Sequence, residues 1–181
     1  MTDEIKPRIS FPPPSERVIK FLEAHPKADW QDQIEFIADN FPQIKDGQLQ
    51  WLLYGSAAIA LLLPEQLARS PKDTDIVTWD KIMTREFINS RIFDVKTIQD
   101  WFQLRGLSFT PEKGKLLFDQ NIAVPFRGKP LKVFNPLALI VSKSFPWFGQ
   151  PDRREQDTSD INLLQVSPDQ VKSFIAQLKD T

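Results

Sequence analysis

The sequence predicts a mixed α/β (α+β) fold: a small mixed β-sheet flanked by helices, with an N-terminal helical pair. Three observations predict it. Apolar residues recur at helical spacing near both ends of the chain, short apolar or alternating runs of strand length lie between them, and 15 prolines divide the 181 residues into many short elements. A hydrophobic fraction of 41% and a charged fraction of 26% are close to globular averages, so the chain can bury a core.

Composition excludes several classes of function. The chain has no cysteine, which rules out disulfides, thiolate catalysis and cysteine-based metal sites, and its single histidine argues against multi-histidine metal sites and a Ser-His-Asp triad. With 23 Lys+Arg against 24 Asp+Glu, no global field attracts nucleic acid or an anionic membrane. No apolar run is long enough to span a bilayer and no secretory signal is evident, so we expect a cytoplasmic protein without membrane contact.

The first elements are helical. Three consecutive prolines precede Ser15, a residue type that favours helix N-caps, and the helix that follows is expected to end before Pro26. Asp29 is expected to begin a second helix that ends before Pro42. The predicted units are therefore a flexible arm at 1–14, a helical pair at 15–45 that packs on the core, and a domain at 46–181.

In the remainder, strands and helices are mixed. A buried strand, a Gly-Ser turn and an apolar helix come first, and the chain closes with two helices, the last of which is amphipathic. The expected strands are 49–54, 73–79, 115–118 and 129–134, with 121–126 either strand or loop; the expected helices are 57–63, 83–92, 97–104, 136–145, 160–164 and 168–178.

The most informative stretch runs from Trp51 to Trp79. A Gly-Ser turn at a helix N-terminus, here Gly55-Ser56, offers backbone N–H groups and a hydroxyl to a phosphate. Asp73 and Asp75, two positions apart on the next strand, point to the same face. Paired carboxylates suit Mg²⁺ or Mn²⁺, so the stretch combines a phosphate cradle with a divalent-metal clamp, as nucleotidyl transfer requires.

These residues resemble the signature of the DNA polymerase β-like nucleotidyltransferases in their small stand-alone form. The nearest likeness is to the AbiEii-type branch found in toxin–antitoxin and phage-defence systems, and it covers about residues 49–165. The segments that carry it are Gly55-Ser56 with Ala57, Ala58 and Leu61 to Leu63, Arg69 to Asp73 with Asp75, Leu139 to Lys143, and Arg153-Arg154 with Asp157, Asp160 and Ile161.

The resemblance implies a nucleotidyltransferase-type sheet and transfer of a nucleoside monophosphate from an NTP to a hydroxyl of tRNA or protein. Mg²⁺ or Mn²⁺ is the implied cofactor, and an antitoxin is an implied partner. The implied metal-binding and catalytic residues are Asp73, Asp75 and Asp119, and the implied nucleotide-binding residues are Gly55, Ser56, Arg69 and Lys143. Asp119 follows the expected strand 115–118 and is the one credible third carboxylate.

Other interpretations stay open. A catalytically silent domain that keeps the fold for binding is favoured by the long spacing between Ser56 and Asp73, and a small-molecule nucleotidyltransferase of the antibiotic-modifying kind differs only in its acceptor. Lys143 is either a phosphate contact or an exposed lysine. The basic residues of 113–132 either guide a nucleic acid or keep a sheet edge soluble. Arg153, Arg154, Asp157 and Asp160 are better explained as an ion-pair lattice that fixes the C-terminal helices.

Overall fold

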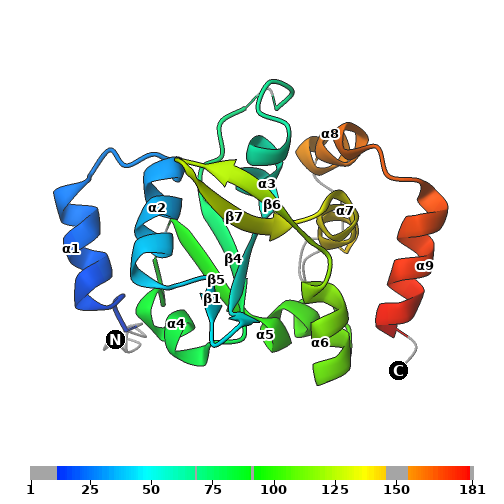
Figure 1. Cartoon of the computed structure of the whole chain (residues 1–181), viewed down its shortest axis with the longest axis horizontal. Coiled ribbons are helices and arrows are strands. Elements are labelled where there is room, and N and C mark those ends of the chain that lie inside the picture. Colours follow the sequence, from blue (N-terminus) through cyan, green and yellow to red (C-terminus); the bar gives the residue numbers. More distant parts are fainter. Residues whose placement is uncertain (1–11, 68, 91, 146–154, 180–181) are drawn as a thin grey trace, which may run out of the picture.

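A computed structural model describes residues 12–67, 69–90, 92–145 and 155–179. The mixed α+β class is confirmed, with helices placed around a central sheet (Figure 1). The helices are α1 (Glu16–Ala24), α2 (Trp30–Asn40), α3 (Gly55–Leu62), α4 (Lys81–Glu86), α5 (Ile98–Gln103), α6 (Pro111–Phe118), α7 (Pro136–Ser144), α8 (Glu155–Leu164) and α9 (Pro168–Lys179). The strands are β1 (Ile44–Lys45), β2 (Gln48–Leu49), β3 (Trp51–Tyr54), β4 (Thr74–Thr78), β5 (Phe93–Thr97), β6 (Asn121–Phe126) and β7 (Lys129–Phe134).

The central sheet has five strands in the order β5-β4-β3-β7-β6. β4 pairs with β5 and β3 with β7 in parallel, whereas β3 pairs with β4 and β6 with β7 in antiparallel fashion. As a result β3 and β7 end, and β4, β5 and β6 begin, at one common edge, which we call the site edge. β1 and β2 form a separate small hairpin.

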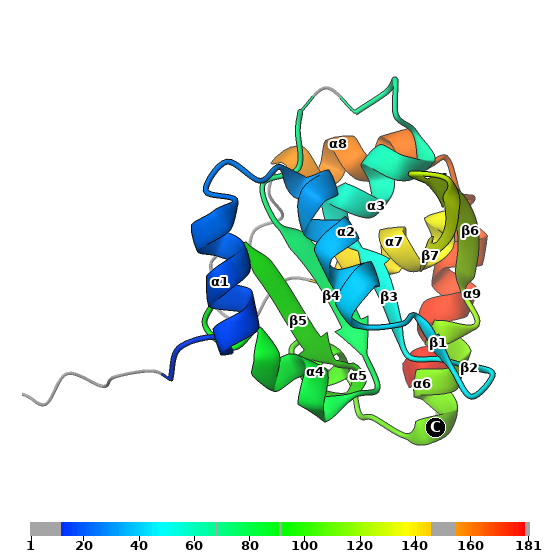
Figure 2. The same cartoon turned by 60° about the vertical axis from the view of Figure 1, so that its left-hand side comes forward.

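Helices cover both faces of this sheet. Figures 1 and 2 show α1 and α2 on one side and α7, α8 and α9 on the other. The fully buried Val18, Ile34 and Ile37 of α1 and α2 belong to the same hydrophobic cluster as the strands. A buried hydrogen bond from Thr74 Oγ1 to Gln33 Oε1, 2.7 Å long, also ties β4 to α2. Since side chains alternate along a strand, Asp75 faces away from α2.

Side-chain caps explain where several helices begin. Asp29, which was expected to begin this helix, is its N-cap and accepts from the backbone N–H groups of Gln31 and Asp32. Asn135 likewise caps α7 by accepting from Ala138 N, and a proline follows it at the first helical position. Ser15 stands at the N-cap position of α1 without a side-chain cap. The ends of α1 and α2 before Pro26 and Pro42 agree with the sequence.

The expected strand at 115–118 is wrong, because these residues belong to α6. Thr110 caps that helix by accepting from Lys113 N, and Pro111 follows at a position that favours helix starts. The expected helix 83–92 is shorter and lies at Lys81–Glu86, and a strand that was not predicted, β5, follows it. Residues 121–126, left open between strand and loop, form a strand.

Some predictions fall on residues outside the described part. They concern residues 1–11 of the arm, and Arg153 and Arg154. Within the described residues, none of the helices has the length and apolar character needed to cross a membrane.

Candidate functional site

The Gly-Ser turn and the Asp-x-Asp strand meet at the site edge. Gly55 is the first residue of α3 and has a positive φ of 71°. A Cβ atom added there would lie 2.1 Å from Asp75 Oδ2, so the Asp75 carboxylate lies directly against the start of α3. Glycine is therefore required twice, for its backbone conformation and for the close approach. The first N–H groups of a helix lack intrahelical acceptors and carry partial positive charge, which favours anions here.

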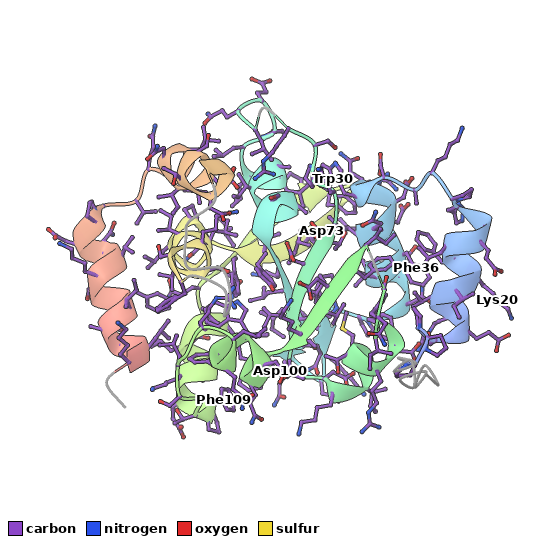
Figure 3. The ribbon with its side chains drawn as sticks, turned by 180° about the vertical axis from the view of Figure 1, so that it is seen from behind. Lys20, Trp30, Phe36, Asp73, Asp100 and Phe109 are labelled. Carbon is purple, nitrogen blue, oxygen red and sulfur yellow. The ribbon has the colours of Figure 1, made fainter. Side chains whose placement is uncertain are left out.

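Three neighbouring strands place Tyr54, Asp75 and Asp94 side by side. Tyr54 is the Cα partner of Asp75 across β3 and β4, and Asp75 is the partner of Asp94 across β4 and β5. In-register partners point to the same face, on strands about 4.8 Å apart. Asp73 precedes β4 and lies at the same end of that strand (Figure 3). We call Asp73, Asp75 and Asp94 the acidic row.

Asp73 and Asp94 lie close enough to Asp75 to change the pKa of its carboxyl group. Burial first, and then the negative charges of Asp73 and Asp94, raise the pKa of Asp75 to about 7. Burial and the charges of Asp75 and Asp94 also raise the pKa of Tyr54. The positive charges of Lys96 and Lys143 act on Asp75 in the opposite direction. Carboxylates that repel one another are therefore partly balanced by lysines of the same chain.

Two of the four nucleotide-binding residues expected from the sequence, Arg69 and Lys143, meet at one buried carboxylate, that of Asp160 in α8, which is 2% exposed. Arg69 Nη2 lies 2.6 Å, and Lys143 Nζ 2.8 Å, from Asp160 Oδ2. Arg69 Nη1 also donates to Ser56 Oγ at 2.9 Å, and Lys143 Nζ lies 2.9 Å from Asp157 Oδ1. Asp157 and Asp160 thus form ion pairs that join α8 to the Gly-Ser turn and to α7.

The acidic row has side chains of the type that binds a hard divalent cation, but they are not arranged as a metal site. No group of three or more His, Cys, Asp or Glu side chains is preassembled to hold a metal in the part of the chain that the structure describes. Lys96 forms an ion pair with Asp94, and a carboxyl of pKa about 7 at Asp75 is easily protonated. Carboxylate oxygens are nevertheless the ligand type that Mg²⁺ and Mn²⁺ prefer, and a helix N-terminus beside them favours a phosphate.

The structure does not bring Asp119 to the acidic row. It caps the C-terminus of α6, where Lys115 Nζ lies 2.8 Å from its Oδ2. The strand that follows it, β6, is separated from β4 by β7 and β3, which is three strand spacings or about 14 Å. A magnesium ion bound by Asp75 needs ligand oxygens at about 2.1 Å, which a side chain three strands away does not supply. The carboxylate on the strand next to Asp75 is that of Asp94.

Asp94 was missed although the sequence contains a signal for it. In Phe93–Thr97, residues with high strand propensity stand at every second position, at Phe93, Val95 and Thr97, with Asp94 and Lys96 between them. The helices expected at 83–92 and 97–104 left only residues 93–96 between them, so the five-residue strand Phe93–Thr97 was not predicted.

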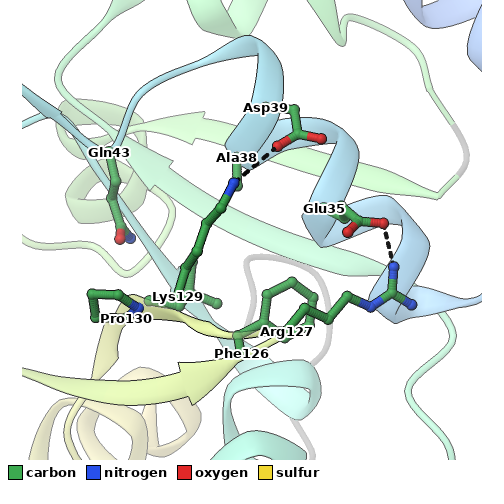
Figure 4. A pocket seen from close by; sticks show the side chains of 9 residues that line it. Glu35, Ala38, Asp39, Gln43, Phe126, Arg127, Lys129 and Pro130 are labelled. Atoms are coloured by element: carbon green, nitrogen blue, oxygen red, sulfur yellow. Dashed lines mark hydrogen bonds and ion pairs between the residues drawn. The ribbon is translucent and has the colours of Figure 1, made fainter.

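Two basic residues of the hairpin of β6 and β7 form ion pairs with α2. Arg127 forms ion pairs with Asp32 and Glu35, and Lys129 Nζ lies 3.9 Å from Asp39 Oδ1. Together with Phe126 and Gln43, these side chains border a hollow of about 180 Å³ between α2 and the hairpin (Figure 4). Lys113 is buried and donates to Ser108 Oγ at 3.0 Å. Arg127 and Lys129 are thus balanced by carboxylates of α2, whereas Lys113 is buried away from any outside partner.

Comparison with known proteins gives one structural likeness. No protein-family model matches the chain, and no curated protein sequence matches it. Among solved structures, the chain is similar to an antigenic nucleotidyltransferase-like protein from Paracoccidioides brasiliensis. The identity is 15%, the superposition covers 92% of this chain and 89% of that chain, and the TM-score is 0.47.

Proposed function

We propose that this chain is a metal-dependent nucleotidyltransferase, which transfers a nucleoside monophosphate from an NTP to an acceptor hydroxyl. The observation that carries the proposal is the contact between Asp75 and the glycine at the start of α3, in register with Asp94. It places two neighbouring, partly exposed carboxylates against a helix N-terminus, so that a cation and a phosphate could bind side by side.

Each residue of the site has a distinct role in the proposed reaction. Asp73, Asp75 and Asp94 would hold Mg²⁺ or Mn²⁺, which supplies charge neutralisation for the triphosphate and its leaving group. The N–H groups at Gly55 and Ser56 bind phosphate oxygens, and Arg69, which donates to Ser56, and Lys143 offset phosphate charge. The acceptor oxygen bonds to the α-phosphorus, pyrophosphate leaves with its bridging oxygen, and the hydroxyl proton passes to a carboxylate of the acidic row.

The acceptor hydroxyl in the proposed reaction belongs to a protein, an RNA or a small molecule. The resemblance to AbiEii-type proteins implies a tRNA or protein acceptor in a toxin–antitoxin setting, with an antitoxin as partner. Pairing of Arg127 and Lys129 with α2 reduces the charge that the hairpin offers to RNA, which favours a protein or a small-molecule hydroxyl.

A second function, nucleotide or partner binding without turnover, is favoured by one specific observation. Lys96, Lys143 and Arg69 each form an ion pair with a carboxylate of the chain itself. A triphosphate would have to replace these carboxylates before it could be held for reaction.

Calorimetry with each of the four NTPs, in Mg²⁺ or Mn²⁺, tests the proposal. Wild-type protein is expected to bind an NTP only with metal, Asp75→Asn to lose that binding, and Asp119→Asn, an acidic position elsewhere on the same sheet edge, to keep it. Absence of binding to folded wild type would overturn the proposal. Metal-dependent binding without release of pyrophosphate in the presence of protein, RNA and small-molecule acceptors would establish the silent alternative.

A further inference from the structure

Arg105 joins the ends of two helices next to the candidate site. Its Nη1 donates to the carbonyl oxygen of Trp101 in α5 at 3.0 Å, and its Nη2 donates to Ser142 Oγ in α7 at 2.9 Å. Nε and Nη2 also reach the Ser142 carbonyl oxygen at 3.4 Å. Both carbonyls lie in the last turn of their helices, where the C=O groups lack intrahelical donors and the helix dipole favours a cation.

Packing fixes the Arg105 guanidinium in this place. It stacks 3.9 Å above the ring of Trp101, a fully buried residue that itself packs edge-on against Phe134 of the sheet. Burial lowers the pKa of Arg105, while Tyr54 and then the negative charges of Asp75 and Asp94 act to raise it, so this guanidinium lies near Tyr54 and these two carboxylates. Its hydrogen bonds to the two helices go to the ends of α5 and α7.

Ser142 directly precedes Lys143, so an anchor on Ser142 determines where the lysine side chain begins. The Lys143 side chain is 10% exposed and runs to Asp157 and Asp160, and its charge reaches Asp75. A shift in the last turn of α7 would move Nζ away from these three carboxylates together.

We infer that Arg105 is a positioning residue, which holds the last turn of α7 against α5 and thereby places Lys143 in the phosphate-binding site. The placement is a statement about the fold, while the consequence for nucleotide binding rests on the proposed function. Lysine cannot replace this arginine fully, because one ammonium cannot stack on Trp101 and also bridge the ends of two helices.

The first experiment measures the placement without nucleotide. The rate at which acetic anhydride modifies Lys143 is followed by mass spectrometry in wild type, Arg105→Met and Ser142→Ala. We expect a severalfold rise in Arg105→Met and a smaller one in Ser142→Ala, which keeps the carbonyl contacts. Arg17→Met is the matched control, because Arg17 also joins two elements, bonding Glu86 at 2.9 and 3.0 Å and stacking on Phe41. An unchanged rate at Lys143 in Arg105→Met and Ser142→Ala would overturn the inference.

The second experiment measures MgATP binding in a double-mutant cycle with Arg105→Met and Lys143→Met. Loss of a hydrogen-bonded charge corresponds to about tenfold in affinity, so each single variant is expected to bind about tenfold more weakly. If Arg105 acts through Lys143, the double variant binds no more weakly than Lys143→Met. Additive losses would overturn the inference, since a merely structural role does not depend on Lys143.

The two proposals fail in different ways. Faster modification of Lys143 in Arg105→Met, with no NTP binding to wild type, supports its placement by Arg105 and overturns the proposed function. Should Arg105→Met fail to fold, Arg105→Lys and Ser142→Ala carry the same measurements. Arg105→Lys is expected to fall between wild type and Arg105→Met in both readouts.

Discussion

Substitution of Gly55 by alanine tests the contact on which the candidate site depends. The new Cβ would lie 2.1 Å from Asp75 Oδ2, whereas an ordinary contact is at least about 3.4 Å, so the carboxylate must move by more than 1 Å. The positive φ costs about 1–2 kcal/mol in any residue with a Cβ. Displacing the closely packed Asp75 side chain adds roughly 1–3 kcal/mol. We expect a loss of about 2–5 kcal/mol in the free energy of unfolding, measured by urea denaturation, and loss of metal-dependent NTP binding, measured by calorimetry.

Two other glycines provide the control for this experiment. Gly47 and Gly106 have φ values of 73° and 67°, and no described atom lies within 4 Å of a Cβ built on either. Gly47→Ala and Gly106→Ala therefore report the backbone cost alone and should leave NTP binding intact. Equal destabilisation in Gly55→Ala and these controls, together with unchanged binding, would refute the contact between Asp75 and the start of α3.

Three further predictions concern the acidic row and the core beneath it. The pKa of Asp75 is about 7 in the folded protein and near 4 in the unfolded chain. Its contribution to stability is therefore complete below pH 4 and is lost as pH rises through 7, by up to about 4 kcal/mol. Urea denaturation without divalent cations at pH 4 to 8 should show a flatter pH dependence in Asp75→Asn than in wild type. Asp94→Asn should abolish metal-dependent NTP binding in calorimetry and Asp119→Asn should leave it unchanged, the reverse of the assignment made from the sequence alone. Thr74→Val leaves the buried Gln33 oxygen without its 2.7 Å donor and should lower the free energy of unfolding by about 1–3 kcal/mol in urea denaturation, whereas an unchanged stability would show that this bond is replaceable.

Local signals account for the parts of the fold that were predicted correctly. Proline after α1 and α2, an N-cap aspartate at residue 29 and apolar periodicity in α9 are all set within a few residues. The segment 115–118 was predicted as a strand because Lys115-Leu116-Leu117-Phe118 has the composition of a short strand. It is helical because it continues a helix that is capped five residues earlier, at Thr110. Short apolar runs of this kind do not distinguish the two states by themselves.

In the candidate site, too, local sequence features were predictable and contacts between distant segments were not. Gly55, Ser56, Asp73 and Asp75 belong to one strand–turn–helix–strand stretch, and that order was enough to predict the meeting of Gly55 and Asp75. Asp94 comes to Asp75 only through the parallel pairing of β4 with β5, which the sequence does not specify. The convergence of Arg69 and Lys143 on Asp160 likewise depends on how α8 packs against α3 and α7, so it required the structure.

The central claim is that a divalent cation and a triphosphate share the site formed by the acidic row and the start of α3. A crystal structure with Mn²⁺ and a non-hydrolysable NTP tests it most directly, because manganese can be located by its anomalous scattering. The account predicts an anomalous peak at coordinating distance from Asp75 and Asp94, with phosphate oxygens at the backbone of Gly55 and Ser56. A nucleotide bound elsewhere, or an acidic row without manganese at saturating concentration, would contradict it.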